Sequence, residues 1–96
     1  MPSSAEAVEL ARREPMFYAS VGVHPHDAKD FTDADIPVLE KWLTTEEKVV
    51  ALGEIGLDYY YDLSPRDVQK DVFARQLDLA YALDKPVILH IRANAD

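Results

Sequence analysis

Cysteine is absent from the sequence. No disulfide can stabilise the fold, and no thiolate can act as nucleophile or metal ligand, so histidine and carboxylate side chains are the candidates for binding a metal ion. Long apolar runs are also missing: no segment approaches the roughly 20 apolar residues of a membrane helix, and the first residues lack the basic and apolar regions of a secretory signal. A cytoplasmic protein is expected.

Basic residues are scarce, with ten Lys and Arg against eighteen Asp and Glu and a formal net charge of −8. This balance argues against a protein that coats nucleic acid through a broad positive surface. It argues much less against a metal-dependent phosphodiesterase, because bound cations change the sign of the local charge. A chain of 96 residues with 48% apolar content fits one domain or part of one, over residues 1–96.

Periodicity predicts helices and strands in alternation. Three helices are predicted from apolar spacing and capping residues, over residues 4–13, 32–45 and 64–83, with Ser4 and Ser64 as the expected caps of the first and the third. Three short apolar segments of strand character lie between or after them, over residues 16–23, 48–54 and 87–90. This order predicts an α/β fold, in which a parallel sheet is built from right-handed βαβ units.

The longest predicted helix offers one large apolar stripe. The stripe is expected to pack on the inner strands, with the residues Phe73, Leu77, Ala80 and Leu83 facing Val49, Ala51, Val87 and Leu89. Under this prediction Leu77→Ala would cost roughly 2–5 kcal/mol of stability.

Each predicted strand ends in or runs into a possible metal ligand or acid/base group, namely His24, Glu54 and His90. Parallel strands bring their carboxyl ends to one face, with neighbours about 4.8 Å apart, so these side chains are expected to converge. A single histidine in a loop or a glutamate at a strand end is often structural, but three together favour a site. Glu54 is expected to be buried among apolar residues, and a buried carboxylate needs a partner such as a metal ion.

Several collinear segments resemble the TatD-type metal-dependent DNases. The most specific is Gly-Glu-Ile-Gly-Leu-Asp-Tyr-Tyr at residues 53–60, and it is accompanied by residues 21–26, 64–66, 76–77 and 85–92. The resemblance implies a TIM-like (β/α) barrel of the metal-dependent hydrolase superfamily. It also implies two divalent cations, Mg, Mn or Zn, that activate water against a phosphodiester bond of DNA.

The resemblance also implies roles for individual residues. Glu54 matches the catalytic carboxylate that bridges both metal ions, and His90 matches a histidine that ligates one of them. His24 and His26 are assigned to the pocket rim and to substrate phosphate, because the family's metal-binding His-x-His belongs to the first barrel strand.

Two further residues, Asp58 and Arg92, match positions near the substrate. Arg92 would pair bidentately with a phosphate group. For each of the two, the alternative that it merely orders a loop stays open.

The family pattern also contains segments that this sequence lacks, among them the first-strand His-x-His, a further metal-binding histidine and a late Asp. The predicted strands correspond to the third, fourth and fifth of eight, and residues 91–96 lack the Asp that commonly follows the Arg. A hydrolase therefore competes with a truncated, non-catalytic α/β fragment that self-associates through open sheet edges. Amide-bond hydrolysis on the same metal architecture is a related alternative. The number of ligands separates the alternatives, since one Glu and one His leave most metal coordination positions to water.

Overall fold

Three parallel strands with helices packed against them form the computed structural model, which describes residues 1–93. In chain order the elements are α1 (Pro2–Arg13), β1 (Ala19–Val21), the 3₁₀ helix η1 (Pro25–Asp30), α2 (Asp35–Thr45), β2 (Val49–Asp58), α3 (Arg66–Leu83) and β3 (Val87–Arg92). The sheet order is β1-β2-β3, and both pairs are parallel. The predicted α/β fold with a parallel sheet is therefore confirmed. The sequence does not predict η1.

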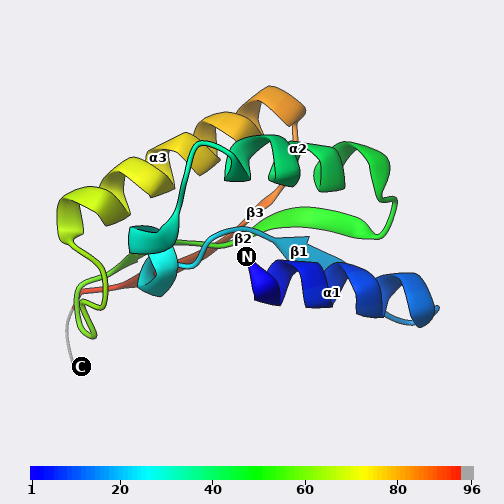
Figure 1. Cartoon of the computed structure of the whole chain (residues 1–96), viewed down its shortest axis with the longest axis horizontal. Coiled ribbons are helices and arrows are strands. Elements are labelled where there is room, and N and C mark those ends of the chain that lie inside the picture. Colours follow the sequence, from blue (N-terminus) through cyan, green and yellow to red (C-terminus); the bar gives the residue numbers. More distant parts are fainter. Residues whose placement is uncertain (94–96) are drawn as a thin grey trace.

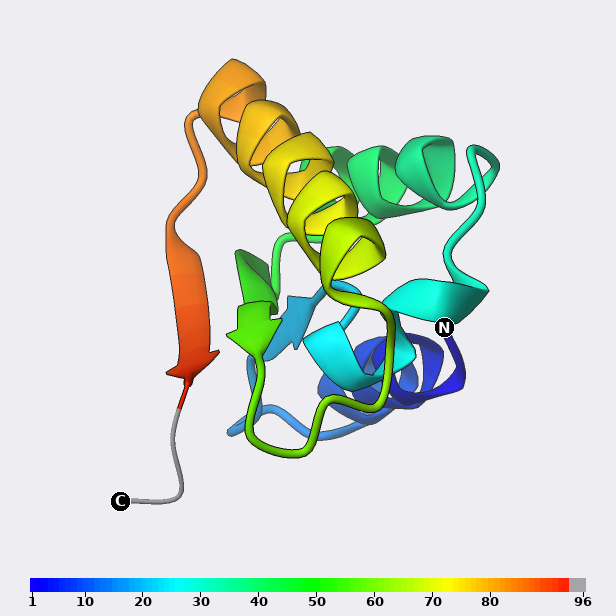
Figure 2. The same ribbon diagram turned by 90° about the vertical axis from the view of Figure 1, so that its left-hand side faces the viewer.

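The helices cover β1 and β2 and share one apolar core with them. In Figure 1, α2 and α3 lie above the strands and α1 lies below them. Each helix contributes two residues to this core, namely Val8 and Ala11, Leu39 and Leu43, and Leu79 and Ala80. They meet buried strand residues such as Val21, Leu52 and Ile55. Figure 2 shows β3 at the edge of the sheet, away from α1 and α2.

The predicted contact face of α3 is only partly right. The buried residues of this helix are Gln69, Val72, Gln76, Leu79 and Ala80. Leu77 is 37% exposed and Leu89 is 57% exposed, so their predicted burial is wrong. The error arises because the prediction used only the apolar residues of the helix. The buried face of α3 also contains two glutamines, Gln69 and Gln76.

The strand boundaries also differ from the prediction. β1 is shorter, and Met16, Phe17 and Tyr18 before it are exposed. β2 continues to Asp58 and β3 to Arg92, beyond their predicted ends. Residues 94–96, which entered the comparison with the family pattern, lie outside the described residues. Within residues 1–93, no helix combines the length and the apolar character required to cross a membrane.

Glu54 lies within β2 rather than at its end. The pairing with β3 shifts between Gly53 and Ile55, so Glu54 has no partner in the ladder and forms a β-bulge. Its side chain is 53% exposed, and the prediction of a buried carboxylate at this position is wrong. The buried carboxylate of the strand is Asp58, which is fully inaccessible.

Candidate active site

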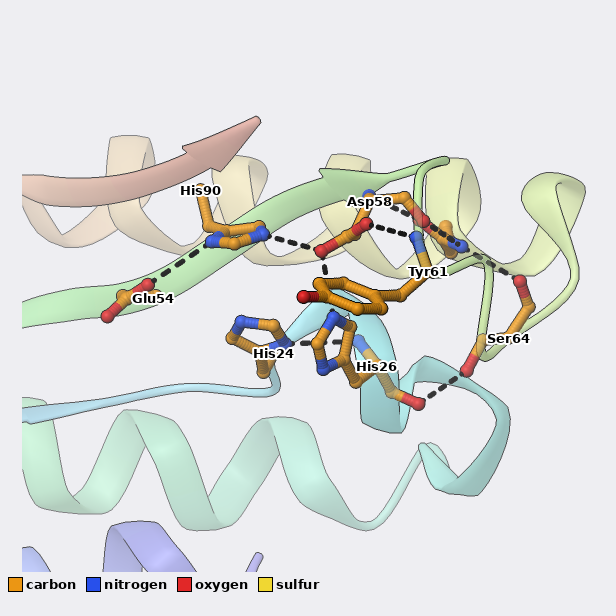
Figure 3. A network of polar contacts seen from close by, with 8 residues as sticks. His24, His26, Glu54, Asp58, Tyr61, Ser64 and His90 are labelled. Atoms are coloured by element: carbon orange, nitrogen blue, oxygen red, sulfur yellow. Dashed lines mark hydrogen bonds and ion pairs between the residues drawn. The ribbon is translucent and has the colours of Figure 1, made fainter. Parts of the chain in front are cut away.

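Three histidines and Asp58 form a cluster near the carboxyl ends of the strands (Figure 3). His24 follows β1, His26 lies in η1, and His90 lies in β3. One oxygen of Asp58, Oδ2, accepts hydrogen bonds from Nε2 of His26 and from Nε2 of His90, both at 2.8 Å. The other oxygen, Oδ1, accepts one from the backbone N–H of Tyr61 at 3.0 Å. The buried carboxylate of Asp58, at the end of β2, thus links η1 through His26 to β3 through His90.

Asp58 is ionised at neutral pH. Burial alone would raise the pKa of its carboxyl group, but hydrogen bonds from the Tyr61 N–H, His90 and His26 outweigh burial and hold the pKa well below its usual range. An ionised carboxylate is only an acceptor, so each histidine must donate the proton on Nε2. In the neutral rings of His26 and His90 the lone pair is then on Nδ1.

The second ring nitrogen of His90 faces Glu54. His90 Nδ1 and Glu54 Oε1 are 3.5 Å apart. A lone pair and a carboxylate oxygen repel each other unless a second proton or a cation lies between them. Two ligands each about 2.1 Å from a tetrahedral metal ion are about 3.4 Å apart, so these two residues fit a shared ion. Figure 3 shows the two side chains directed toward each other from β2 and β3.

His24 has a different protonation pattern. Its Nδ1 accepts a hydrogen bond from the backbone N–H of His26 at 3.1 Å, so the neutral ring carries its proton on Nε2. Burial lowers the pKa of His24, and nearby His26 and His90 lower it further. His24 is therefore a neutral hydrogen-bond donor at pH 7. Potential ligand atoms of His24, His26 and His90 all lie within 4.8 Å of one another.

Two glutamines of α3 fix the backbone beside these residues. Gln76 accepts from the N–H of Val23 at 2.7 Å and donates to its carbonyl at 3.1 Å. Gln69, roughly two helical turns earlier, does the same for Asp58 at 2.7 and 3.2 Å. Gln76 thus takes the place of a neighbouring strand at Val23, beyond the end of β1, and Gln69 does so at Asp58, the last residue of β2. The only sequence signal for these positioning residues is a pair of polar residues seven apart on an apolar helix face.

Two serines predicted as helix caps contribute to the site instead. Ser4 lies inside α1, and its hydroxyl group donates to the carbonyl of Gly22 and accepts from the N–H of Gly22, both at 3.1 Å. Ser64 makes no cap on α3; its hydroxyl donates to the carbonyl of His26 at 2.8 Å and accepts from the N–H of Lys29 at 3.1 Å. The prediction of both caps is wrong, because long-range backbone partners hold these hydroxyl groups.

Glycine is required at position 56, where the backbone of β3 lies directly against β2. Gly56 has φ of +149°, and a Cβ atom there would collide with the carbonyl group of His90. The missing side chain lets the backbone of His90 lie against β2.

Arg92 lies at the rim of the cluster rather than inside it. Its guanidinium carbon is 4.3 Å from the ring centre of Tyr60 and 5.5 Å from that of Tyr61. The ring of Tyr61 is in turn 5.6 Å from His26. The six residues predicted for the site therefore lie in one region, and their individual roles stay predictions.

A cavity of about 720 Å³ opens beside the cluster. His24, His26 and Glu54 line it together with Gly22 and Gly53. Asp27, Asp30 and Asp35 add carboxylates to the wall. The cavity gives a ligand access to His24, His26 and Glu54, whereas Asp58 is buried and does not line it.

Parallel strands with helices on the sheet and a polar cluster toward the carboxyl ends have the arrangement of part of a (β/α) barrel, whose active sites occupy that face. The chain belongs to the TatD related DNase family, whose model matches residues 1–96. YjjV, a TatD homologue from Escherichia coli K12, has a similar structure with a TM-score of 0.82 and 38% identity, over 92% of this chain and 34% of that chain. This similarity confirms the predicted partial barrel.

Curated relatives support the same family. The chain is 44% identical over 91 residues to the uncharacterized metal-dependent hydrolase YabD of Bacillus subtilis, covering 95% of this chain and 35% of YabD. It is 37% identical over 89 residues to the 3'-5' ssDNA/RNA exonuclease TatD of Salmonella typhimurium, covering 93% of this chain and 34% of the relative. The chain thus spans about a third of the length of these relatives.

Proposed function

We propose that the chain forms part of the active site of a divalent-metal-dependent hydrolase that cleaves phosphodiester bonds in DNA. The observation that carries this proposal is the 3.5 Å approach of His90 Nδ1 to Glu54 Oε1 while Asp58 holds the opposite nitrogen of the same ring. That arrangement leaves two electron-rich atoms facing each other, which a cation stabilises. The relatives named as a metal-dependent hydrolase and a single-strand exonuclease support the same function.

Each residue has a distinct task in this proposal. Glu54 and His90 hold the metal, Asp58 fixes the tautomer of His90, and the His24 Nε2–H donates to a phosphate oxygen. Glu54 and His90 would contribute ligands to a site for two divalent ions, which would supply an activated water and electrostatic stabilisation of the negative charge on the phosphate. Arg92 pairs with a neighbouring phosphate. The proposed location is the cytoplasm, as the sequence predicts.

Metal affinity and hydrolysis test the proposal separately. Titration calorimetry with Mn²⁺ should show that Glu54→Gln weakens binding by at least about tenfold, because it removes the charged ligand. Glu47→Gln is the matched control, since Glu47 is exposed and precedes β2. Hydrolysis of a single-stranded oligonucleotide with Mg²⁺ or Mn²⁺ should be lost in Glu54→Gln and kept in Glu47→Gln. Equal metal binding by both variants would overturn the ligand assignment, and hydrolysis that survives Glu54→Gln would overturn its catalytic role.

A further inference from the structure

Two exposed tyrosines follow directly on the buried end of β2. Tyr60 is 42% exposed and Tyr61 is 53% exposed, although both lie next to a polar cluster. Their rings pack edge to face, with centres 4.7 Å apart. Exposed aromatic rings in a fixed arrangement offer flat surfaces on which another ring can stack.

Arg92 adds positive charge to this pair. Its guanidinium group lies over both rings, as a cation–π contact. Within residues 1–93 it forms no ion pair with a carboxylate, although the chain carries a net charge of −8. A guanidinium group without a carboxylate partner, in an acidic protein, is suited to a ligand that brings its own negative charge.

The pair is tied to the proposed metal site. The backbone N–H of Tyr61 donates to Asp58, and the Tyr61 ring lies 5.6 Å from the His26 ring. Tyr61 is therefore close enough to His26 for one nucleotide to contact both residues, with its phosphate at the histidines and its base at the tyrosine ring. The same carboxylate thus fixes both the histidines and the aromatic loop.

We propose that Tyr60, Tyr61 and Arg92 form a stacking platform for a nucleobase of single-stranded nucleic acid. An unpaired base can leave its neighbours and stack on tyrosine or guanidinium planes, whereas a base in a duplex stays within its own stack. The platform therefore selects single strands over duplexes. This inference rests on the proposed function, because it assumes that a phosphate occupies the histidine cluster.

Binding of labelled oligonucleotides tests the platform. Fluorescence anisotropy with Ca²⁺, under conditions where the oligonucleotide is recovered intact, would compare a single strand, the same strand with abasic sites, and a duplex. Tyr60→Leu and Tyr61→Leu should each weaken binding of the single strand by roughly tenfold. The abasic strand should bind weakly and equally to wild type and variants, and the duplex should bind more weakly than the single strand.

Tyr18→Leu is the matched control. Tyr18 is also exposed and also has a cation above its ring, Lys48, but it precedes β1 at the opposite end of the strands. Circular dichroism would check that the variants fold. The platform would be overturned if wild type and both platform variants bound the single strand equally well. It would also be overturned if the variants lost as much affinity for the abasic strand as for the intact strand, or if the wild type did not bind the single strand. Base-dependent binding without hydrolysis by the wild type would count against the proposed function alone.

Discussion

Asp58 is the residue on which the geometry of the site depends most directly. It is the only fully buried carboxylate among residues 1–93, and it binds two histidines that come from different elements. Because it determines which ring nitrogen carries the proton, it determines which nitrogen can bind a metal ion. Its contribution to the site therefore does not require contact with the substrate.

Asp58→Asn tests this indirect role. The amide preserves the shape but removes the ionised acceptor for the two Nε2 protons, so Mn²⁺ binding should weaken by about 10- to 100-fold. The ¹⁵N shifts of the histidine rings should show a changed tautomer in the metal-free protein. Asp78→Asn, at an exposed position of α3, is the control. Unchanged ring shifts in Asp58→Asn would contradict the positioning role.

Stability should fall as the pH is lowered. His24 and Asp58 both have a pKa below the ordinary value in the folded protein, so each stabilises the fold fully only above its unfolded pKa. The urea midpoint should therefore be constant above about pH 7 and decline below about 6.5, because the unfolded chain binds a proton at His24 more readily than the folded protein does. It should decline again below about 4 for the same reason at Asp58. His24→Gln should remove the first decline and keep the second. A midpoint that rises between pH 7 and pH 5 would contradict this assignment.

At the scale of elements, α3 acts as a support for the site. Gln76→Leu preserves volume but leaves the N–H and carbonyl of Val23 without partners, which should cost about 1–3 kcal/mol for each group. Leu77→Ala, one residue further along the exposed side, should cost less than about 1 kcal/mol. Urea unfolding of the two variants measures the difference. Similar losses of unfolding free energy in both variants would show that the hydrogen bonds between Gln76 and Val23 contribute little to stability.

The sequence predicts the elements better than their details. Helix, strand and parallel order follow from apolar spacing, because covered strands such as β2 are apolar on both faces. The glycines on either side of Glu54 permit an irregular strand, but they do not determine which residue is left out of the ladder. The roles of Ser4 and Ser64 also escape local patterns, because their partners lie 18 and 38 residues away. His24, His26, Asp58 and His90 are predicted as one region, but the network through Asp58 is not.

At the scale of the whole molecule, the edge at β3 is the most exposed apolar surface of the sheet. Leu89 and Ile91 are each 57% exposed there, although they belong to a strand. Such an edge favours pairing with another strand, so the isolated chain should self-associate at high concentration. Sedimentation analysis should show a mass that rises with concentration, and Ile91→Lys should lower it. Val38→Lys, on exposed α2 surface, is the control. A constant monomer mass would contradict this prediction.

The two hydrogen bonds between Gln76 and Val23 can form only late in the synthesis of the chain. Val23 and Gln76 are separated by 53 residues, so the segment that leads into His24 leaves the ribosome well before Gln76 does. Until α3 has emerged and docked, the peptide group of Val23 can be bound only by water. The segment that carries His24 is therefore fixed only after α3 has docked, although it is synthesised well before α3.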